Sequence, residues 1–541
     1  MSRDAQFLEL GAETEGKQCE SDIPSTNDVE VCIGRKSEKV REDLEDPEDS
    51  DESFYDPEES SGEDLEESGG SEELAGSGAA GESVPPALEA DGVRRSRRSN
   101  FGVPPEHLND YVVGLAAQCS GEPATYREAV AGPEKEKWLD AMKEELRSLE
   151  ENNTWSLVTP PTGCETIGCR WVFKKKEDSQ GNVVRYKARL VAQGFLQKFG
   201  RDFDQVFAPV AMQSTFRVLL TIASQRKLNV YHVDVKTAYL YGTLEEEIFM
   251  RQPPGFVVAG KEDKVCKLNR SIYGLKQAAR VWNNTIKDFL IANDFVQSSS
   301  DACLSMKKLN DREWMYLLIY VDDMVIICRD HNEMLRVEEE LRQRFRITSL
   351  GPVHLFLGIA VNKDANGVYS IDQSSFIRKI AKVYGLEESK KSKIPMDTGY
   401  YKYAEKSEGL PNNVEYHSLV GSLLYVSTNT RPDIAASVSI LSRKIKNPLQ
   451  ADWTELKRVV RYLCGTVDHR LQLGAVEADR IFKLEGFCDA DWASDTSDRK
   501  SNSGFVFRFG NATISWGSRK QTCVSESTME AEYVALAEAV Q

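Results

Sequence analysis

Two adjacent aspartates, Asp322 and Asp323, interrupt the most apolar stretch of this chain. They lie between residues 315–320 and 324–328, two runs that contain only apolar and aromatic residues. Short, continuous apolar runs are typical of strands buried in a core, so the pattern predicts a hairpin with two carboxylates at its bend. Neighbouring buried carboxylates repel each other and lose hydration, so each tends to take up a proton unless a cation compensates. The alternative is an Asp-Asp turn exposed to water, which hairpins also accommodate.

A third aspartate stands in another apolar run upstream. Asp234 lies in residues 230–235, and the pattern changes to a turn immediately afterwards. Three carboxylates on two strands are hard oxygen ligands of the kind that Mg²⁺ uses together with substrate phosphates. Two metal ions about 4 Å apart in such a site activate an attacking hydroxyl and stabilise the leaving oxygen. The sequence therefore predicts a two-Mg²⁺ site at Asp234, Asp322 and Asp323, with Mn²⁺ as a substitute ion.

The charge of the chain is concentrated near its N-terminus. The formal net charge is −18, yet residues 1–90 hold 28 Asp+Glu against 6 Lys+Arg, so the remainder carries +4. A body of that charge is compatible with a polyanionic partner in a local groove. Residues 1–92 are predicted to be a disordered acidic tail, because they cannot bury enough apolar surface to offset ordering entropy. The basic stretch 93–100 opens a Pro-containing linker over 93–124, with nuclear targeting or nucleic-acid contact as alternatives to a solvated linker.

Cysteine usage and hydropathy both indicate an intracellular protein. The eleven cysteines form no CxxC pair and are odd in number, which favours reduced thiols. Residues 1–10 lack a signal pattern, and the apolar stretch 315–328 is too short to span a bilayer. We therefore expect no membrane partner.

Periodicity predicts a mixed α+β body that begins near Thr125. An amphipathic helix is expected from Pro133 to the Asn152-Asn153 pair. Alternating runs predict strands at 155–158, 170–174 and 183–191, with a Gly181-Asn182 turn between the last two. Further helices are expected at 216–223, 286–291, 334–345, 416–426, 434–445 and 453–464. The C-terminal part is expected to form strands at 481–488, 504–509 and 513–516, and a closing helix at 527–540.

The residues around the three aspartates resemble the catalytic core of reverse transcriptases. The match consists of Tyr320-Val321-Asp322-Asp323 together with Asp234 in the upstream sequence VDVKTAYLYG. The surrounding sequence is similar to copia-type LTR retrotransposon Pol polyproteins from about residue 122 to the end. The motifs that carry this similarity are Trp171-Val172-Phe173-Lys174, Arg185-Tyr186-Lys187-Ala188-Arg189-Leu190-Val191-Ala192, Phe207-Ala208-Pro209-Val210, Gln252-Pro253-Pro254-Gly255-Phe256 and Ser271-Ile272-Tyr273-Gly274-Leu275-Lys276-Gln277-Ala278.

The resemblance implies a right-hand-like polymerase. Fingers and palm would occupy 125–350, primer grip, thumb and connection 351–470, and a partial ribonuclease H-like α/β domain 471–541. The implied activity is RNA-directed and DNA-directed DNA polymerisation, in which a dNTP extends a primer 3′-hydroxyl on an RNA template, a DNA primer or an RNA–DNA hybrid. The implied location is cytoplasmic or particle-associated, with a nuclear location through the basic linker as an alternative. The competing hypothesis is a truncated or host-adopted fragment that is catalytically silent and at most binds nucleic acid or protein.

The resemblance also implies roles for single residues around the nucleotide. Tyr239 would exclude a ribose 2′-hydroxyl, although a core tyrosine at the start of a helix is the alternative. Lys187 and Arg189 lie in a basic strand pair with Lys174, Lys175 and Lys176, and would meet the incoming triphosphate or the template. A solvated hairpin face is the alternative for these cations.

Further roles concern the template, the primer and a second acidic site. Gln277 would support the nucleotide and template, and His354-Leu355-Phe356-Leu357-Gly358 resembles the primer grip, with an ordinary apolar hairpin as the alternative. Ser527-Thr528-Met529-Glu530 predicts a capping box, and Glu532 shares a helical face with Met529, Leu536 and Ala539, so we expect it to point inward beside Asp489. Asp489 and Glu532 match the first two of four acidic residues in the ribonuclease H site. Since the chain stops at Gln541, before any segment that could supply the other two, we expect no ribonuclease activity from this part alone.

Overall fold

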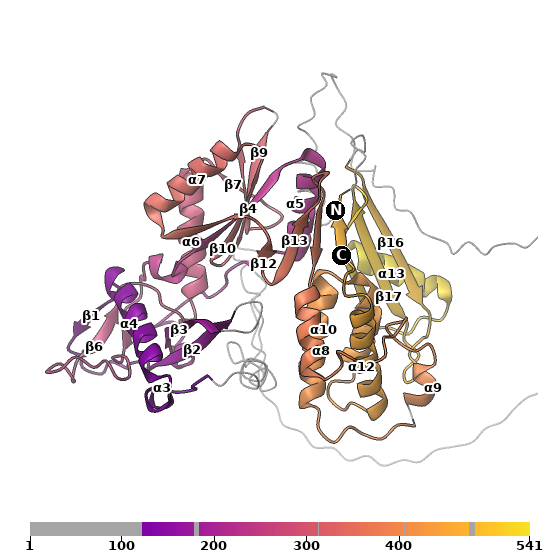
Figure 1. Cartoon of the computed structure of the whole chain (residues 1–541), viewed down its shortest axis with the longest axis horizontal. Coiled ribbons are helices and arrows are strands. Elements are labelled where there is room, and N and C mark those ends of the chain that lie inside the picture. The colour runs from indigo at the N-terminus through magenta and orange to yellow at the C-terminus, as the bar shows by residue number, and fades with distance from the viewer. Residues whose placement is uncertain (1–121, 178–182, 312, 405, 475–481) are drawn as a thin grey trace, which may run out of the picture. The chain divides into compact units, whose positions relative to one another are not determined.

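The computed structural model describes residues 122–541 except 178–182, 312, 405 and 475–481. The predicted acidic tail, the basic stretch 93–100 and the predicted turn at Gly181-Asn182 lie outside the described residues. All described residues fall in one unit by their backbone contacts, and Figure 1 shows the elements within it. In the described part of the chain, no helix is both long and apolar enough to cross a bilayer.

A six-stranded antiparallel sheet carries the three predicted aspartates, and we call it the carboxylate sheet. Its strand order is β11-β4-β10-β9-β8-β7. The predicted hairpin is confirmed, because β9 ends at Tyr320 and β10 begins at Asp323. The strand bounds are β4 Asn229–Val235, β7 Val296–Gln297, β8 Leu304–Lys308, β9 Trp314–Tyr320, β10 Asp323–Cys328 and β11 Ile347–Pro352.

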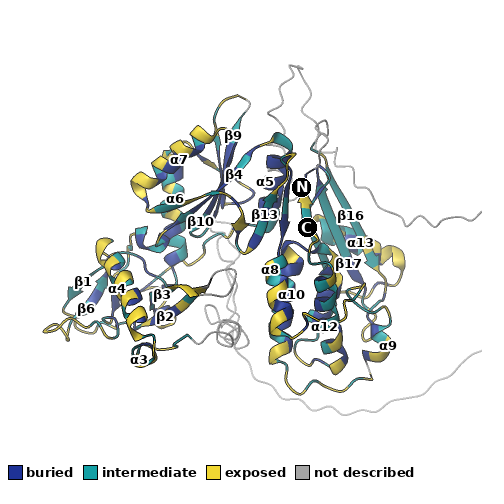
Figure 2. Cartoon of the chain, in the orientation of Figure 1, coloured by how far each residue is buried: buried dark blue, intermediate teal, exposed yellow. Residues whose placement is uncertain are grey.

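Both faces of the carboxylate sheet are covered, which explains why its central strands read as continuous apolar runs. On one face, Val325 and Leu318 pack in a core with α5, Gln213–Arg226. On the other face, Ile326 and Leu317 pack with α6, Ala278–Ala292, and α7, His331–Arg344. Figure 2 shows β4, β9 and β10 largely in the colour of buried residues. The carboxylates therefore sit at the end of a rigid, buried framework.

The N-terminal described elements form a separate core beside a two-stranded hairpin, which we call the basic hairpin. It consists of β2, Cys169–Glu177, and β3, Val183–Ala192. Helix α4 covers one side of it and ends at Glu151, as predicted, and Asn153 there adopts a positive φ of 50° that stops helical propagation. The remaining bounds are α3 Tyr126–Ala131, α4 Lys135–Glu151, β1 Trp155–Val158, η1 Gly194–Leu196, η2 Ala238–Tyr241, β5 Phe249–Met250 and β6 Val265–Leu268.

The two faces of the basic hairpin differ because side chains alternate along a strand. Tyr186 and Phe173 face α4, and their rings pack edge-on against Trp138 at centroid distances of 4.8 and 5.2 Å. Lys187 pairs with Lys174 across the hairpin and points to the opposite side. The aromatic face anchors the hairpin on α4. On the opposite face, Lys174 forms an ion pair with Glu122 at 3.2 Å, and Lys187 and Arg189 face away from α4's aromatic contact.

A helical layer follows the carboxylate sheet. Figure 1 shows α8, α10 and α12 side by side, and their shared core includes the fully buried Tyr416, Leu423 and Leu456. A four-stranded sheet has the order β12-β13-β14-β15. Its first three strands come before α8 in the chain, and β15 follows α12. The bounds are β12 Leu355–Phe356, β13 Ile359–Lys363, β14 Tyr369–Asp372, α8 Ser374–Val383, α9 Tyr400–Ala404, α10 Val414–Asn429, η3 Pro432–Ile434, α11 Ala435–Ser442, α12 Gln450–Gly465 and β15 Leu471–Leu473.

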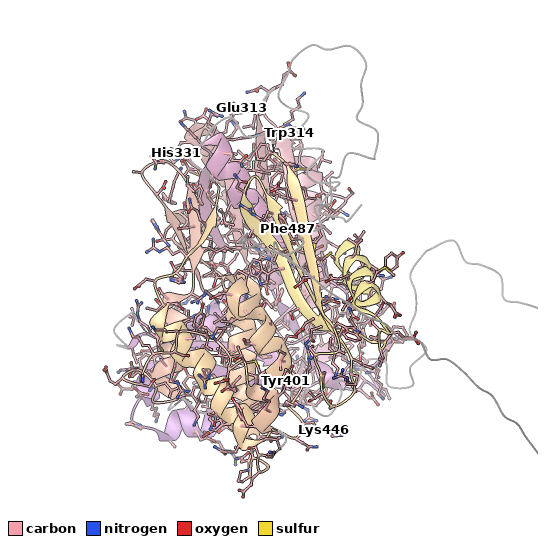
Figure 3. The ribbon with its side chains drawn as sticks, turned by 90° about the vertical axis from the view of Figure 1, so that its right-hand side faces the viewer. Glu313, Trp314, His331, Tyr401, Lys446 and Phe487 are labelled. Atoms are coloured by element: carbon pink, nitrogen blue, oxygen red, sulfur yellow. The ribbon has the colours of Figure 1, made fainter. Side chains whose placement is uncertain are left out.

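The C-terminal elements are a three-stranded antiparallel sheet and one helix, as predicted. They are β16 Leu484–Asp491, β17 Asn502–Phe509, β18 Ala512–Lys520 and α13 Thr528–Val540, and Figure 3 shows Phe487 on this sheet. The guanidinium of Arg217 on α5 donates to the carbonyls of Ile514, at 2.6 Å, and Asn429, at 3.1 Å. A charged, buried donor with these partners joins α5 to both β18 and α10.

Two details of the predicted last helix are wrong. The Ser527 hydroxyl accepts from the Glu530 amide, but the Glu530 carboxylate accepts from the amide of Glu526, one residue before the cap, so the capping box is not reciprocal. The buried residues of α13 are Ala531 and Ala535, whereas Met529 is 77% exposed, so the predicted inward face is wrong for Met529. The reason is that small side chains let α13 lie close to the sheet, a preference that the positions of the larger apolar residues did not reveal. Glu532 is exposed, but it lies beside Asp489 as expected.

Candidate active site

The site is built around the turn between β9 and β10. Asp323 opens β10 and lies opposite Asp234 on β4 and opposite Tyr320 on β9. Val321 and Asp322 form the turn itself, and the Asp322 carbonyl accepts a hydrogen bond from the Val235 amide at 2.8 Å. The register between β4 and β10 therefore brings all three predicted aspartates to one end of the carboxylate sheet.

A cleft of about 370 Å³ opens beside this turn. Asp234 and Asp322 line it from the sheet, and Lys187 and Arg189 line it from the basic hairpin. The other lining residues are Ala141, Glu144, Glu145, Arg147, Ser148, Glu151, Arg185, Tyr186, Ala188, Val235, Lys236, Thr237, Tyr273 and Arg346. The cleft thus places acidic groups and cationic groups from distant parts of the sequence around one space.

The two carboxylates in the cleft are held at an electrostatic cost. Burial raises the pKa of Asp322, and the neighbouring charges of Asp323 and Asp234 raise it further. Burial also raises the pKa of Asp234, with a second contribution from Asp323. Nearby cations oppose these shifts, namely Lys187 for Asp234 and Arg189 for Asp322. The net rise shows that these cations do not offset the combined effect of burial and of the neighbouring carboxylates.

Asp323 has a different partner. Its Oδ1 lies 3.0 Å from Nε2 of His232, which stands two residues before Asp234 and so on the same face of β4. The His232 ring in turn packs edge-on against Phe356 at 5.7 Å. Asp323 is therefore oriented along the sheet face by a buried imidazole.

The donor set fits a hard divalent cation such as Mg²⁺. In the described part of the chain, no three His, Cys, Asp or Glu side chains are close enough to hold a metal ion by themselves. Asp234 and Asp322 nevertheless offer carboxylate oxygens whose charge the protein leaves under-compensated. Mg²⁺ is usually bound by one or two carboxylates, with waters and substrate phosphates as the other ligands, so the residues present are sufficient for that mode.

The cations on the hairpin side of the cleft repel one another. Burial lowers the pKa of Lys187, and the like charges of Arg189 and Lys176 lower it further. The Arg189 guanidinium lies 4.8 Å from the centroid of the Tyr273 ring, and the Tyr273 ring packs edge-on against Tyr239 at 4.9 Å. Clustered cations that repel one another are suited to a polyanionic ligand such as a triphosphate, whose charge relieves the repulsion.

Tyr239 lies next to the cleft in η2, immediately after β4. Burial raises its pKa, and the charge of Asp322 adds to the rise. The segment that carries Tyr273 can approach β3 because Gly274 has a φ of 94°, and a Cβ there would lie 2.2 Å from the Ala192 carbonyl oxygen. A stack of Arg189, Tyr273 and Tyr239 therefore connects the cations on the hairpin side of the cleft to the end of β4.

Gln277 lies apart from this group. It is 1% exposed and lines a second cavity of about 690 Å³. Its Oε1 accepts from Gln197, and its Nε2 donates to the carbonyl of Asp202. Its amide thus holds the segment around 197–202 against the start of α6, and a contact with a nucleotide stays a prediction.

The predicted primer grip forms a tight hairpin between β12 and β13. Phe356 is buried on the carboxylate sheet, whereas Leu355 is exposed. Leu357 and Gly358 form the turn with positive φ values of 51° and 78°. Tyr425 on α10 donates to the Leu357 carbonyl. The hairpin therefore contacts both His232 and the helical layer, which is compatible with either of the two predicted roles.

The second acidic pair comes together at the C-terminal sheet. Asp489 lies on β16, and Glu532 lies on α13. Burial raises the pKa of Glu532, and the neighbouring Asp489 carboxyl raises it further. The two groups are therefore neighbours, although Glu532 is exposed.

Sequence reasoning missed two residues of the main site. His232 could have been found, because strand alternation places it on the same face as Asp234. Tyr273 belongs to one of the motifs that carry the resemblance, but no local signal placed it at the site. Its position depends on how two segments about 80 residues apart in sequence, one of them holding Arg189, pack together.

Comparison with known families assigns a domain to this fold and site. A family model described as "Reverse transcriptase (RNA-dependent DNA polymerase)" matches residues 152–398. That range includes the basic hairpin, the whole carboxylate sheet and the cleft aspartates. The chain therefore carries a reverse transcriptase domain.

Three relatives define the family more closely. The Retrovirus-related Pol polyprotein from transposon TNT 1-94 of Nicotiana tabacum is 40% identical over 425 residues, which cover 77% of this chain and 32% of that protein. The Pol polyprotein from transposon RE2 of Arabidopsis thaliana is 37% identical over 448 residues, which cover 83% and 29% respectively. A transposon Ty5-1 protein of Saccharomyces cerevisiae is 30% identical over 309 residues, or 57% of this chain and 99% of the yeast protein. The chain belongs to the copia-type LTR retrotransposon Pol family, which confirms the predicted resemblance, and it spans about a third of the length of the plant relatives.

Proposed function

We propose that this chain is an RNA-directed and DNA-directed DNA polymerase that extends a primer from dNTPs. The observation that carries the proposal is the convergence of Asp234 and Asp322 with Lys187 and Arg189 around one cleft of a reverse transcriptase domain. In the reaction, the primer 3′-hydroxyl attacks the α-phosphate of a bound dNTP, and pyrophosphate leaves. The partners are an RNA or DNA template and a DNA primer.

The chain's residues would position the reactants. Asp234, Asp322 and Asp323 would hold two Mg²⁺ ions, which supply charge stabilisation for the attacking and leaving oxygens. Lys187 and Arg189 would bind the triphosphate from the opposite wall of the cleft. A cleft that orients reactants with fixed charges can provide much of the acceleration of phosphoryl transfer.

Two further assignments belong to the same proposal. Tyr239, next to Asp322, would exclude a ribose 2′-hydroxyl. The carboxylate sheet would serve as the palm, the basic hairpin as part of the fingers, and the β12–β13 hairpin with the helical layer as primer grip, thumb and connection. The C-terminal sheet with Asp489 and Glu532 would be a partial ribonuclease H-like domain.

Primer extension on poly(rA)/oligo(dT) with Mg²⁺ tests the proposal. We expect the full chain to incorporate dTTP and Asp322→Asn to lose roughly 100-fold or more of that rate, because a transition-state charge contact is removed. Asp263→Asn changes an exposed carboxylate that does not line the cleft; it is the matched control and should retain the wild-type rate. Equal rates for wild type and Asp322→Asn would refute the catalytic assignment. Incorporation by neither protein would favour the silent-fragment hypothesis.

A further inference from the structure

The turn that presents Asp322 contains a backbone conformation that its sequence disfavours. Val321 has a φ of 57°, in the left-handed region where the Cβ of an L-residue crowds the backbone. Valine is β-branched, so its side chain has little freedom to relieve that crowding. Such conformations persist only where surrounding contacts fix them. The partners of this turn are therefore the groups that maintain the position of Asp322.

One of these partners is the indole of Trp282, a residue of α6 in the core between that helix and the carboxylate sheet. Nε1 of Trp282 on α6 donates a hydrogen bond to the Val321 carbonyl at 2.7 Å. Trp282 is 2% exposed, and its ring packs edge-on against Phe345 at 5.4 Å and lies 6.2 Å from Tyr241. Packing on two sides fixes the ring, and so it also fixes the direction of the N–H group.

A second partner holds the next carbonyl from a different direction. The Val235 amide donates to the Asp322 carbonyl at 2.8 Å, and Val235 directly follows Asp234. Trp282 and Val235 together hold two successive carbonyls, one on each side of the Asp322 Cα. With both carbonyls held, the Asp322 side chain leaves the backbone in one direction, toward the cleft that Asp322 lines.

We propose that Trp282 is a positioning residue for the Asp322 carboxylate. Its indole N–H holds the Val321 carbonyl and so maintains the strained turn in the form that turns Asp322 into the cleft. The inference rests on the proposed polymerase function for its catalytic consequence. The hydrogen bond itself and its effect on the turn do not depend on that function.

The competing explanation is that Trp282 is only a satisfied core tryptophan. The chain offers a matched control for that case in Trp171, which is also 2% exposed and donates from Nε1 to the Pro254 carbonyl at 3.0 Å. Trp171 lies on β2 of the basic hairpin and packs into the core that holds Trp138, and its hydrogen bond and ring contact are to Pro254 and Phe256, not to the β9–β10 turn. Substitution of either residue by phenylalanine removes one buried indole N–H and leaves an aromatic ring.

Hydrogen–deuterium exchange of the metal-free protein is the first test. In Trp282→Phe we expect the Val235 amide to exchange roughly five- to tenfold faster than in wild type, the factor that corresponds to one lost hydrogen bond. The same amide should be unaffected in Trp171→Phe. Unchanged exchange at Val235 in Trp282→Phe would overturn the positioning role, whatever the activity of the protein.

The Mg²⁺ dependence of primer extension is the second test. We expect Trp282→Phe to raise the Mg²⁺ concentration for half-maximal rate roughly tenfold, because a mobile carboxylate is a poorer ligand. Trp171→Phe should leave that concentration unchanged. Val321→Gly in the Trp282→Phe background should restore most of the lost Mg²⁺ affinity, since glycine adopts a positive φ without strain. No recovery in the double variant, or a shift of equal size in Trp171→Phe, would contradict the proposal.

The positioning role of Trp282 can still be tested if Trp282→Phe does not fold or if the chain is not a polymerase. If Trp282→Phe does not fold, replacement of Trp282 by benzothienylalanine keeps the shape of the ring and lacks the N–H, and the same exchange and Mg²⁺ results are expected. If the wild-type chain extends no primer, the proposed function fails, and exchange at Val235 still decides whether Trp282 holds the turn.

Discussion

At the scale of single residues, the site combines groups that oppose each other's ionisation. Asp322 and Asp234 are raised in pKa chiefly by burial and then by neighbouring carboxylates, while burial and neighbouring cations lower the pKa of Lys187. Such a site lowers the free energy of unfolding of the ligand-free protein. Ligands of opposite charge to each group stabilise the folded protein by relieving the repulsion. Divalent cations and a triphosphate together supply both signs of charge.

This opposition predicts a pH-dependent gain in stability on neutralising one carboxylate. Because the folded-state pKa of Asp322 is raised, its contribution to stability is full below the unfolded pKa of about 3.9 and is lost as pH rises through the folded pKa. Asp322→Asn should therefore raise the thermal midpoint at pH 7.5 in EDTA, by an amount that shrinks toward pH 4. Scanning calorimetry at the two pH values measures the difference.

Added Mg²⁺ provides the control for that experiment. Mg²⁺ should stabilise the wild type more than Asp322→Asn, because the ion binds the folded carboxylates. The difference in thermal midpoint between the two proteins at pH 7.5 should therefore become smaller. A difference that is the same at both pH values, or one that Mg²⁺ leaves unchanged, would show that the substitution acts by packing and not by charge.

At the scale of elements, sequence patterns were sufficient wherever one strong signal decided the structure. The apolar runs around Asp322 predicted β9 and β10, and the spacing of Trp138 and its neighbours predicted α4. The faces of elements were harder to predict. On α13, small alanines and not the larger Met529 face the sheet, because close approach of the helix outweighed the burial of bulkier side chains.

The same limit applies to the site. Asp234 and Asp322 could be placed near each other from sequence, since each ends or interrupts a buried strand. The approach of Lys187 and Arg189 to them could not be derived from local pattern, because it depends on how the basic hairpin packs against the rest of the chain. Local periodicity reports burial, whereas convergence of distant segments is a property of the packed molecule.

The anchoring of the basic hairpin gives a prediction at this scale. Trp138 is 2% exposed, and its ring packs edge-on against Phe173 and Tyr186 of the basic hairpin. Trp138→Ala should therefore lower the local free energy of unfolding by about 3–5 kcal/mol, through lost packing and a cavity. Native-state hydrogen exchange of β3 amides measures that local opening free energy. Met529→Ala, at a residue that is 77% exposed, should change it by no more than about 0.5 kcal/mol. Equal effects of the two substitutions would mean that α4 does not anchor the hairpin.

At the scale of the whole chain, the distribution of charge has a consequence for nucleic-acid binding. Residues 1–92 hold 29 Asp+Glu and 6 Lys+Arg, so their removal changes the formal net charge from −18 to +5. A polyanion is repelled by the first charge and attracted by the second, over distances that salt limits to about 10 Å at 0.1 M. The acidic segment should therefore weaken binding to primer–template most strongly at low ionic strength.

Deletion of residues 1–92 tests this electrostatic role. We expect the shortened chain to bind a fluorescent primer–template roughly tenfold more tightly at 50 mM NaCl, with the advantage shrinking as salt rises, because binding to phosphates weakens with salt and long-range repulsion is screened. A full-length variant with the acidic residues of 1–92 changed to Asn and Gln separates charge from chain length, and it should match the deletion. Since composition predicts no folded core in that segment, the thermal midpoint should stay the same. Equal affinities of the deleted and complete chains at 50 mM NaCl would mean that the acidic segment does not act on nucleic acid through its charge, and a large fall in the midpoint would show that it contributes to the fold.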